Sequence, residues 1–343
     1  MSMRLLVTGG AGFIGSNFVS HMLTAYSDIE IVNMDVLTYA GNLENLAAFE
    51  DDERHIIERR NIASLEDVES VFRRHEIDIV VNFAAESHVD RSLHIGAEAF
   101  IRTNVMGVQM LLDAARVHGV QRFVQISTDE VYGSLGPEGR FTEETPLAPN
   151  NPYAATKAGA DLLVRAAHKS HGIDAVITRC SNNFGPYQFP EKLIPLMIAN
   201  ALEEKPLPVY GDGMNVRDWI YVQDHCRAID DVMRKGRTGE VYNIGSDHDV
   251  PNLEIVKQIL ARVDRSESLI QFVEDRPGHD RRYSMDSAKI RDELGWVPTL
   301  SFEDALKVTV QWYLENGEWL DNLRSGAYQG YYEMLYGERG PAA

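Results

Sequence analysis

A glycine-rich turn near the N-terminus constrains the fold of this chain more than any other feature. Gly9, Gly12 and Gly15 follow a short apolar run and open a segment, residues 13–22, whose apolar residues recur at helical spacing. A strand, glycines and a helix N-terminus form a phosphate cradle, because glycine permits close backbone approach and free N–H groups attract the anion. Asp35 ends the next apolar run, about 20 residues on, where a carboxylate binds an adenosine ribose 2′-hydroxyl. The pattern predicts a dinucleotide site and favours NAD over NADP; a glycine turn without a ligand is the alternative.

The composition excludes several classes of protein. The chain has 343 residues, a formal net charge of −19 and 44% hydrophobic residues, which suits a large core divided between two lobes. The excess of acidic over basic residues argues against a nucleic-acid partner, because contact with a phosphate backbone needs a basic face. No apolar run approaches the roughly 20 residues that span a bilayer, and no signal peptide precedes the glycines, so we expect a cytoplasmic protein without a membrane partner. Cys180 and Cys226 lie far apart without metal-ligand spacing, which predicts reduced thiols and no metal site.

Apolar runs of strand length alternate with helix-period segments through the first 180 residues. The predicted strands are residues 4–8, 30–34, 55–59, 79–83, 122–127 and 175–178, and further helices are predicted at 65–75, 99–118 and 153–171. This alternation predicts an α/β fold, a Rossmann-type doubly wound parallel sheet with helices on both faces. Ligands bind such sheets at the carboxyl ends of the strands.

After residue 180 the pattern loosens. Short extended pieces at 207–210, 218–221 and 240–244 mix with helices predicted at 191–203, 223–235, 253–263 and 302–316. We therefore expect an NAD-binding domain over residues 1–180, to which some later segments return, and a smaller α/β substrate lobe over residues 181–343.

Two groups of polar residues carry candidate chemistry. Tyr153 and Lys157 stand four residues apart on one helix face, where an ammonium lowers the tyrosine pKa from about 10 and makes it a base near neutral pH. Thr128, Asp129 and Glu130 follow a predicted strand and so emerge at the same sheet edge. Two carboxylates in a partly closed pocket do not both ionise easily, so one stays protonated as an acid while the other acts as a base. A solvated acidic turn is the alternative for the carboxylate pair.

The end of the strand predicted at residues 79–83 is a further candidate. Small residues after it allow a flat cofactor to lie against the backbone, and Ser87 can bond a ligand hydroxyl or phosphate. His88 offers an acid or a base, although a packed, hydrogen-bonded histidine is the commoner role. Thr103 and Asn104 either pack in the helix predicted at 99–118 or contact the cofactor.

Basic residues at loop and helix starts mark the second lobe. Lys192 opens a predicted helix, Arg217 precedes a strand, and residues 275–282 contain three arginines. In so acidic a protein they predict an anion pocket, since arginine binds phosphate bidentately. A surface salt-bridge cluster is the alternative for the last two arginines, and Tyr210 either stacks on a base or packs in the core.

Together these motifs resemble an established family. The segments that carry the resemblance are residues 8–15, 37–42, 84–92, 127–133, 180–187, 189–195, 275–283 and 326–329. They are similar to the extended short-chain dehydrogenase/reductases that act on nucleotide sugars, and within them to the dTDP-glucose 4,6-dehydratases. The glycine turn and the Tyr153–Lys157 pair are shared across the superfamily. The Asp129–Glu130 pair discriminates best, because the related epimerases usually lack it.

The resemblance implies a mechanism in which bound NAD is regenerated in each turnover of dTDP-glucose. It implies that Tyr153, tuned by Lys157, takes the proton of the C4 hydroxyl while hydride leaves C4 for the nicotinamide, with Thr128 bonded to that hydroxyl. Glu130 then removes the C5 hydrogen and Asp129 protonates the departing C6 hydroxyl. Hydride returns to C6, which gives a 4-keto-6-deoxy sugar.

The resemblance also implies binding residues and a partner. The implied cofactor-binding residues are Gly9, Gly12, Phe13, Ile14, Gly15, Asp35, Val36, Leu37, Thr38, Asn61, Ile62, Phe83, Ala84, Ala85, Ser87, Thr103, Tyr153, Lys157 and Asn183. The implied substrate-binding residues are Ser87, Thr128, Asn182, Lys192, Leu193, Pro208, Val209, Tyr210, Arg217, Asn252, Asp275, Arg276, Pro277, Gly278 and His279. A homodimer is implied as well, through the helices predicted at 99–118 and 153–171.

The chain departs from the family pattern in places, and rival functions stay open. Asn61 stands where the family usually has Asp, residues 93–98 are unlike the usual pattern, and Ser246 replaces a common glycine. A nucleotide-sugar 4-epimerase or decarboxylase of the same fold is the nearest rival. A catalytically silent NAD-binding regulator is a remoter one, disfavoured because the complete set of catalytic residues is present.

Overall fold

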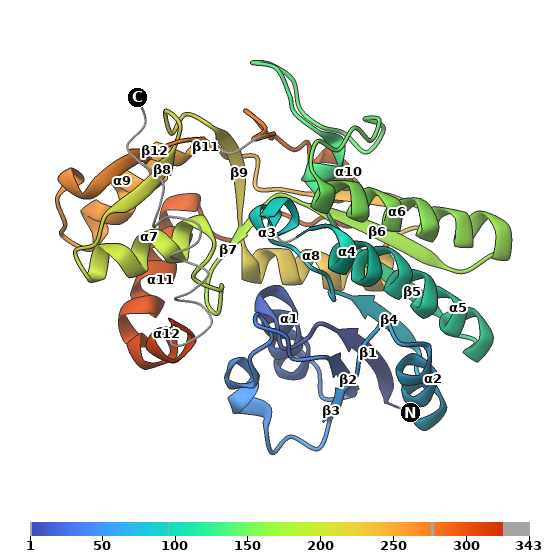
Figure 1. The fold of residues 1–343 in the computed structure, drawn as a ribbon. Coiled ribbons are helices and arrows are strands. Elements are labelled where there is room, and N and C mark those ends of the chain that lie inside the picture. Colours follow the sequence, from blue (N-terminus) through green and yellow to red (C-terminus); the bar gives the residue numbers. More distant parts are fainter. Residues whose placement is uncertain (1, 95, 276–277, 325–343) are drawn as a thin grey trace.

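A parallel sheet of seven strands forms the larger part of the molecule, and its order reverses direction between β1 and β4 (Figure 1). The computed structural model describes residues 2–94, 96–275 and 278–324. The sheet order is β10-β6-β5-β4-β1-β2-β3. Its strands are β1 (Met3–Thr8), β2 (Ile29–Asp35), β3 (His55–Arg59), β4 (Ile79–Asn82), β5 (Arg122–Thr128), β6 (Ala175–Cys180) and β10 (Val241–Ile244). The predicted Rossmann-type parallel sheet is thus confirmed, and the reversal creates a crevice at the carboxyl ends of the strands.

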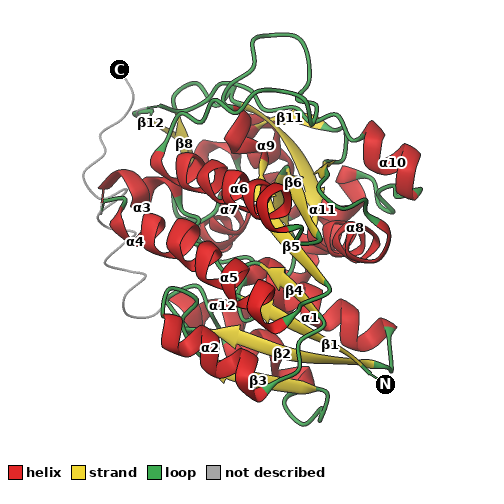
Figure 2. Ribbon diagram, turned by 90° about the vertical axis from the view of Figure 1, so that its right-hand side faces the viewer, coloured by secondary structure: helices red, strands yellow, loops and turns green. Residues whose placement is uncertain are grey.

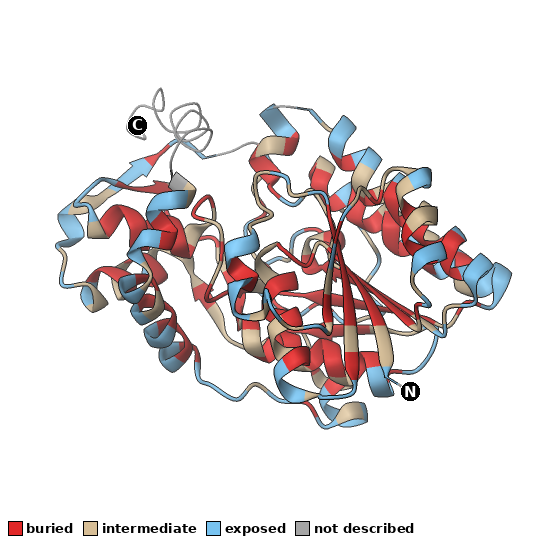
Figure 3. Ribbon diagram, turned by 90° about the horizontal axis from the view of Figure 1, so that it is seen from below, coloured by how far each residue is buried: buried red, intermediate tan, exposed pale blue. Residues whose placement is uncertain are grey.

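Helices cover both faces of this sheet because its strands are apolar on both sides. On one face lie α2 (Leu65–Arg74), α5 (Val108–His118) and α6 (Pro152–His171), seen together in Figure 2. On the other lie α1 (Phe13–Ala25), α8 (Val222–Lys235) and α10 (Ala288–Leu294). Leu5 and Val7 of β1 pack against the second group, whereas Leu6 packs against the first. Figure 3 shows the result, with buried strands between helices whose outer faces are exposed.

The second part of the molecule has a core of its own. A three-stranded sheet contains β7 (Asn182–Phe184), β9 (Val216–Tyr221) and β11 (Asp249–Pro251), and β8 (Leu207–Tyr210) pairs with β12 (Ile270–Val273). The helices that pack there are α7 (Leu193–Leu202), α9 (Asn252–Arg262), α11 (Phe302–Glu315) and α12 (Gly317–Arg324). This part faces the carboxyl ends of the large sheet (Figure 1).

The chain returns to the large sheet after entering the second part. The extended piece predicted at 240–244 is one of the later segments that return: its residues 241–244 form β10, and β10 pairs with β6 at the edge of the large sheet. Helix α8 packs beneath the same sheet. A short apolar run fits either sheet equally well, so local pattern alone cannot place it.

Several local features differ from the predicted elements. The helix predicted at 99–118 is α4 (Glu98–Phe100), a π-helical stretch η2 (Ile101–Gly107) and then α5. Short helices that the pattern did not indicate are η1 (Leu43–Phe49), α3 (Val89–His94), η3 (Asp129–Tyr132), η4 (Glu267–Leu269), α10 and α12. Arg276, Pro277 and the motif at 326–329 lie outside the described residues. Within the described ranges, no helix is long and apolar enough to cross a membrane, and no His, Cys, Asp and Glu side chains cluster as a metal site.

Candidate active site

A pocket of about 440 Å³ lies where the strands of the large sheet end, a size usual for cofactor and small-molecule sites. All the predicted catalytic residues line it, as does every predicted cofactor residue except Leu37. Leu37 instead packs against the core beneath the sheet, and its N–H donates to Asp35 Oδ1 over 2.8 Å. Of the predicted substrate residues, Ser87, Thr128, Asn182 and Lys192 line the pocket. The pocket therefore brings together the two candidate reaction groups and the dinucleotide motif.

The glycine turn has the shape of a phosphate cradle. Gly9 adopts a positive φ of 69°, and a Cβ there would lie 2.7 Å from the Ala84 backbone. Gly15 passes so close to the Gly9 carbonyl that a side chain would overlap it. Helix α1 begins directly after Gly12, and no side chain of the described residues caps it. The first N–H groups of α1 are thus open toward an anion, with no room for anything but glycine around them.

Asp35 links the ribose end of the pocket to this turn. It ends β2, is 8% exposed, and accepts hydrogen bonds from the N–H groups of Ala11 (3.0 Å) and Leu37 (2.8 Å). Burial raises the pKa of Asp35, and these two hydrogen bonds oppose the shift. The carboxylate is therefore held in place by the backbone of the glycine turn, and the predicted adenosine contact and phosphate contact form one unit.

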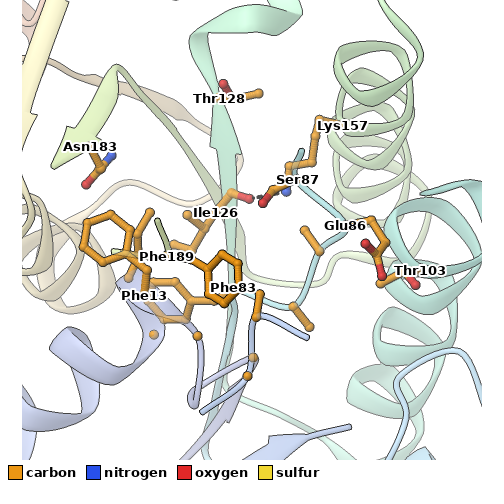
Figure 4. Close-up of a pocket in the computed structure, with 18 of the residues that line it drawn as sticks. Phe13, Phe83, Glu86, Ser87, Thr103, Ile126, Thr128, Lys157, Asn183 and Phe189 are labelled. Atoms are coloured by element: carbon orange, nitrogen blue, oxygen red, sulfur yellow. Dashed lines mark hydrogen bonds between the residues drawn. The ribbon is translucent and has the colours of Figure 1, made fainter. Parts of the chain in front are cut away.

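Helix α6 places Tyr153 and Lys157 at the end of β5. Asn151 caps the helix by accepting from the Ala154 N–H at 2.8 Å, and Pro152 occupies its first turn. Lys157 Nζ donates to the Ile126 carbonyl over 2.6 Å, and both residues line the pocket (Figure 4).

The pKa of Tyr153 differs from the sequence-based expectation. Burial, and then the charge of Glu130, raise the pKa of Tyr153 well above its ordinary range, whereas the sequence predicts a lowered one. Burial also lowers the pKa of Lys157, and the Asp161 carboxylate opposes that shift. The correction follows from desolvation, which spacing along a helix does not reveal.

The carboxylate pair occupies two different environments. Thr128, the last residue of β5, caps η3 by accepting from the Glu130 N–H at 3.3 Å and donates to Asp129 Oδ1 at 3.1 Å. Asp129 is 2% exposed, and burial followed by the Glu130 charge raises its pKa well above the ordinary range of a carboxyl group. Glu130 lines the pocket and accepts from Asn151 Nδ2 at 3.1 Å. Burial thus favours the protonated form of Asp129, and the second carboxyl group, that of Glu130, lines the pocket beside it.

Sequence reasoning missed a polar cluster at the opposite wall of the pocket. The Tyr39 hydroxyl donates to Glu191 Oε1 at 3.1 Å, and the Arg91 guanidinium lies 3.9 Å from the Tyr39 ring centroid. Burial raises the pKa of Glu191 to about 7. Each residue belongs to a motif that carried the family resemblance, but 152 positions separate Tyr39 from Glu191 and no local pattern joins them.

A buried histidine orients one predicted cofactor residue. His225 of α8 is fully buried, and its Nδ1 lies 2.7 Å from Asn183 Oδ1. Burial lowers the pKa of His225 to about 3, so the ring is neutral and Nδ1 carries the proton that Asn183 accepts. Asn183 Nδ2 in turn donates to the Ser181 carbonyl at 3.0 Å. No sequence signal pointed to His225.

The remaining predicted substrate residues lie beyond the pocket, in the second part. Tyr210 donates to Asp90 Oδ2 at 3.2 Å and meets the His279 ring edge-on, and His279 Nδ1 lies 2.6 Å from Asp275 Oδ1. Arg217 is 4% exposed and donates to the Asp280 carbonyl at 2.8 Å. Among the others, Pro208 and Val209 are buried in β8. Leu193 and Asn252 are partly buried at the starts of α7 and α9, and Gly278 is exposed.

The departures from the family pattern have local roles. Asn61 lines the pocket, and its Oδ1 accepts from the Ala63 N–H at 2.8 Å. The Ser246 hydroxyl donates to the fully buried Asp218 at 2.9 Å. Arg281 and Arg282 pair with Asp212 (2.7 Å) and Asp249 (2.9 Å), which is the salt-bridge alternative.

Comparison with known proteins adds the family. A family model described as GDP-mannose 4,6 dehydratase matches residues 6–309. A dTDP-glucose 4,6-dehydratase of Xanthomonas campestris is 51% identical, over 94% of this chain and 97% of its own length. The chain belongs to the dTDP-glucose 4,6-dehydratase family.

Two further relatives support this membership. The dTDP-glucose 4,6-dehydratase of Streptomyces venezuelae, solved with NAD and dTDP bound, superposes with a TM-score of 0.90 at 50% identity, over 94% of this chain and 100% of that one. The low-salt glycan biosynthesis protein Agl12 of Haloferax volcanii is 55% identical, over 92% of this chain and 100% of its own length.

Proposed function

We propose that this member of the family dehydrates dTDP-glucose to dTDP-4-keto-6-deoxyglucose, with NAD that stays bound and is recycled. The observation that carries the proposal is the pair of carboxyl groups, buried Asp129 and pocket-lining Glu130, beside Tyr153. A 4-epimerase of the same fold needs the tyrosine but has no step that requires this acid and base.

The residues present fit NAD. The glycine cradle leaves no room for a Cβ, the start of α1 faces it without a cap, and Asp35 lies where a ribose hydroxyl is bound. When bound, NAD⁺ supplies the group that accepts a hydride and gives it back. Asn61, Thr103 and Asn183 line the same pocket and are proposed as further contacts.

Tyr153 is the proposed base for the C4 hydroxyl. Because burial raises the pKa of Tyr153, the phenolate needs a nearby positive charge, and Lys157 supplies an ammonium one helical turn away. The Ile126 carbonyl fixes that ammonium. Thr128 ends β5 in the pocket and orients the hydroxyl that loses its proton.

Glu130 and Asp129 divide the elimination of water. Oxidation at C4 acidifies the C5 hydrogen, which Glu130, held by Asn151, removes. Asp129, kept protonated by burial, gives its proton to the departing C6 hydroxyl. A base and an acid on adjacent residues suit a reaction at adjacent carbons.

The nucleotide end is proposed to lie in the second part, near Tyr210, Asp275 and His279. Lys192 connects this end to the pocket, since its Nζ donates to the Ser87 carbonyl at 3.0 Å. Arg217, oriented by hydrogen bonds to the Val216 and Asp280 carbonyls, is proposed to supply positive charge for a phosphate. Two buried free thiols, Cys180 and Cys226, agree with the proposed cytoplasmic setting.

We also propose a homodimer through α5 and α6. Leu162 of α6 is about half exposed (56%), as are Ile101 and Met106 of η2 (49% and 47%), which continues into α5. Large apolar side chains gathered on neighbouring helices are typical of an interface between subunits.

Mass spectrometry tests the proposed reaction. Incubation with dTDP-glucose should convert it to a product lighter by one water molecule, without net consumption of added NAD⁺. A product of unchanged mass would indicate epimerisation. In a separate incubation with a nucleotide-linked glucuronate, loss of carbon dioxide would indicate a decarboxylase. An unchanged substrate would indicate a regulator or another nucleotide.

The role of Glu130 has a sharper test. Glu130→Gln removes the proposed base while keeping its shape and its contact with Asn151, so exchange of the C5 hydrogen with solvent deuterium should fall by about a hundredfold or more. The exposed carboxylate of Glu138, changed to Gln, serves as the matched control. Exchange at the control rate in Glu130→Gln would assign the base to another residue.

A further inference from the structure

Residues 36–49, here called the strap, run from the end of β2 to the end of η1 and form part of the pocket wall. Val36, Thr38, Ala40 and Gly41 of the strap line the pocket, as do Gln188, Phe189, Glu191 and Lys192 of the second part. Contacts between the strap and the second part therefore determine whether the pocket wall formed by the strap can move away.

Tyr39 provides the first tie between the strap and the second part. Its hydroxyl donates to Glu191 at 3.1 Å, and its ring meets Phe189 edge-on with centroids 5.6 Å apart. Phe189 and Glu191 both line the pocket, and in Figure 4 the Phe189 ring lies beside Phe13 at the start of α1. The tie thus joins the strap to two residues that line the pocket.

Trp319 provides the second tie, from α12 (drawn in red in Figure 1). The Trp319 indole N–H donates to Asn45 Oδ1 at 2.9 Å, and Asn45 Nδ2 donates to the Ala11 carbonyl at 3.0 Å. Ala11 lies inside the glycine turn, and the Asn42 N–H donates to the same carbonyl at 3.0 Å. Trp319 is 8% exposed and Asn45 6%, so these bonds are shielded from water. Two successive side-chain hydrogen bonds therefore connect the C-terminal helix of the described chain to the phosphate cradle.

We propose that the strap retains the dinucleotide, and that Tyr39 and Trp319 are the positioning residues that keep it closed. The inference rests on the proposed function, in which hydride leaves and returns within one turnover. A cofactor used in this way has to stay bound until hydride has been returned, because its release after the oxidation step would strand a keto sugar. Opening the wall between the strap and residues 188–192 requires both ties to break, so each tie should slow the release of NAD.

Two conservative substitutions test the strap in the holoenzyme. Tyr39→Phe and Trp319→Phe each remove one hydrogen-bond donor and keep an aromatic ring in place. The matched controls are Tyr26→Phe, which loses a bond to Asp230, and Trp296→Phe, which loses a bond to the Asp224 carbonyl. Both lost hydrogen bonds go to residues of α8, and neither involves a strap residue.

The measured quantity is the rate at which bound NAD disappears when the protein is placed with an enzyme that destroys free NAD. Each strap variant should lose NAD about fivefold faster than wild type, and the double variant about tenfold faster or more, as expected for the loss of hydrogen bonds. Added NAD should restore water elimination in the strap variants, whereas a general folding defect would not be reversed in this way. The controls should lose NAD at the wild-type rate.

The outcomes separate the strap from the proposed function. Loss of NAD from both strap variants at the rate of their controls would overturn the strap, even if wild type dehydrates dTDP-glucose. A wild-type protein that holds no NAD and eliminates no water would overturn the proposed function instead. If Trp319→Phe does not fold, Tyr39→Phe against Tyr26→Phe decides the matter alone.

Discussion

Asp129 and Glu130 are neighbours in the chain, yet their surroundings make them chemically different. Asp129 is enclosed under the pocket and shares a hydrogen bond with Thr128, whereas Glu130 reaches into the pocket and accepts from Asn151. Burial and the nearby Glu130 charge keep the pKa of Asp129 high. At this scale, the two neighbours in η3 differ in burial, and the proposed roles of acid and base rest on that difference.

Asp129→Asn should separate stability from catalysis. Carboxyl groups ordinarily ionise at about pH 4, whereas Asp129 in the folded wild type keeps its proton up to its raised pKa. Between these two pH values the unfolded chain has released this proton and the folded protein has not. The free energy of unfolding of the wild type therefore decreases as pH rises through this window. The variant lacks this loss, so its free energy of unfolding relative to wild type should increase over that window, while water elimination falls about a hundredfold or more. Denaturant unfolding at several pH values measures the effect, with exposed Asp28→Asn as control. An identical pH dependence in wild type and variant would refute it.

At the scale of elements, the periodicity of apolar residues predicted the strands and helices whose burial pattern is visible in a single stretch of sequence. The strand predicted at 55–59 and the helix predicted at 65–75 appear as β3 and α2 almost residue for residue. The spacing of apolar residues within each segment is enough to predict such elements. The π-helical turn η2 was not predicted, since Gly107 packs there against Ile62 and that approach depends on the fold. The same holds for the site: motif order placed Tyr153 and Asp129 at one sheet edge, but the Tyr39–Glu191 and Trp319–Asn45 contacts join distant segments and leave no local trace.

The joint between β1 and α1 yields a prediction of its own. In Gly15→Ala the new methyl would meet the Gly9 carbonyl and lie 2.8 Å from Gly10 Cα, so the phosphate turn must shift. We expect the affinity for NAD to fall about tenfold or more while the circular dichroism of the folded protein is kept. Gly136→Ala, where nothing lies within 4 Å of the added atom, is the control. Titration calorimetry with NAD measures both, and equal affinities would contradict a phosphate role for the turn.

At the scale of the whole molecule, the surface formed by η2, α5 and α6 is the proposed contact between subunits. The chain carries a formal net charge of −19, yet Ile101 and Met106 of η2 and Leu162 of α6 are exposed there. The proposed dimer would cover them and leave the pocket, on the carboxyl side of the sheet, open to substrate.

Leu162→Glu should convert the proposed dimer to monomers. A carboxylate at the centre of an apolar contact is desolvated without a partner, and the cost exceeds what a standard interface tolerates. Leu314→Glu, which places the same charge on an equally exposed leucine of α11 (47%), should leave the assembly unchanged. Sedimentation equilibrium distinguishes the two. A monomeric wild type would refute the proposed dimer. A Leu162→Glu variant that remains dimeric would place the subunit contact on another surface.

The position of strand β10 affects how the large sheet can form while the chain is being synthesised. Because β10 is the outermost strand beside β6, the edge of β6 stays unpaired until residues 241–244 leave the ribosome. The glycine turn, Asp35 and Tyr153 are all translated long before that point. During translation the emerging polypeptide therefore carries a nearly finished nucleotide-binding half with one open hydrogen-bonding edge, which makes it a substrate for chaperones and a hazard for aggregation until the later segment comes back.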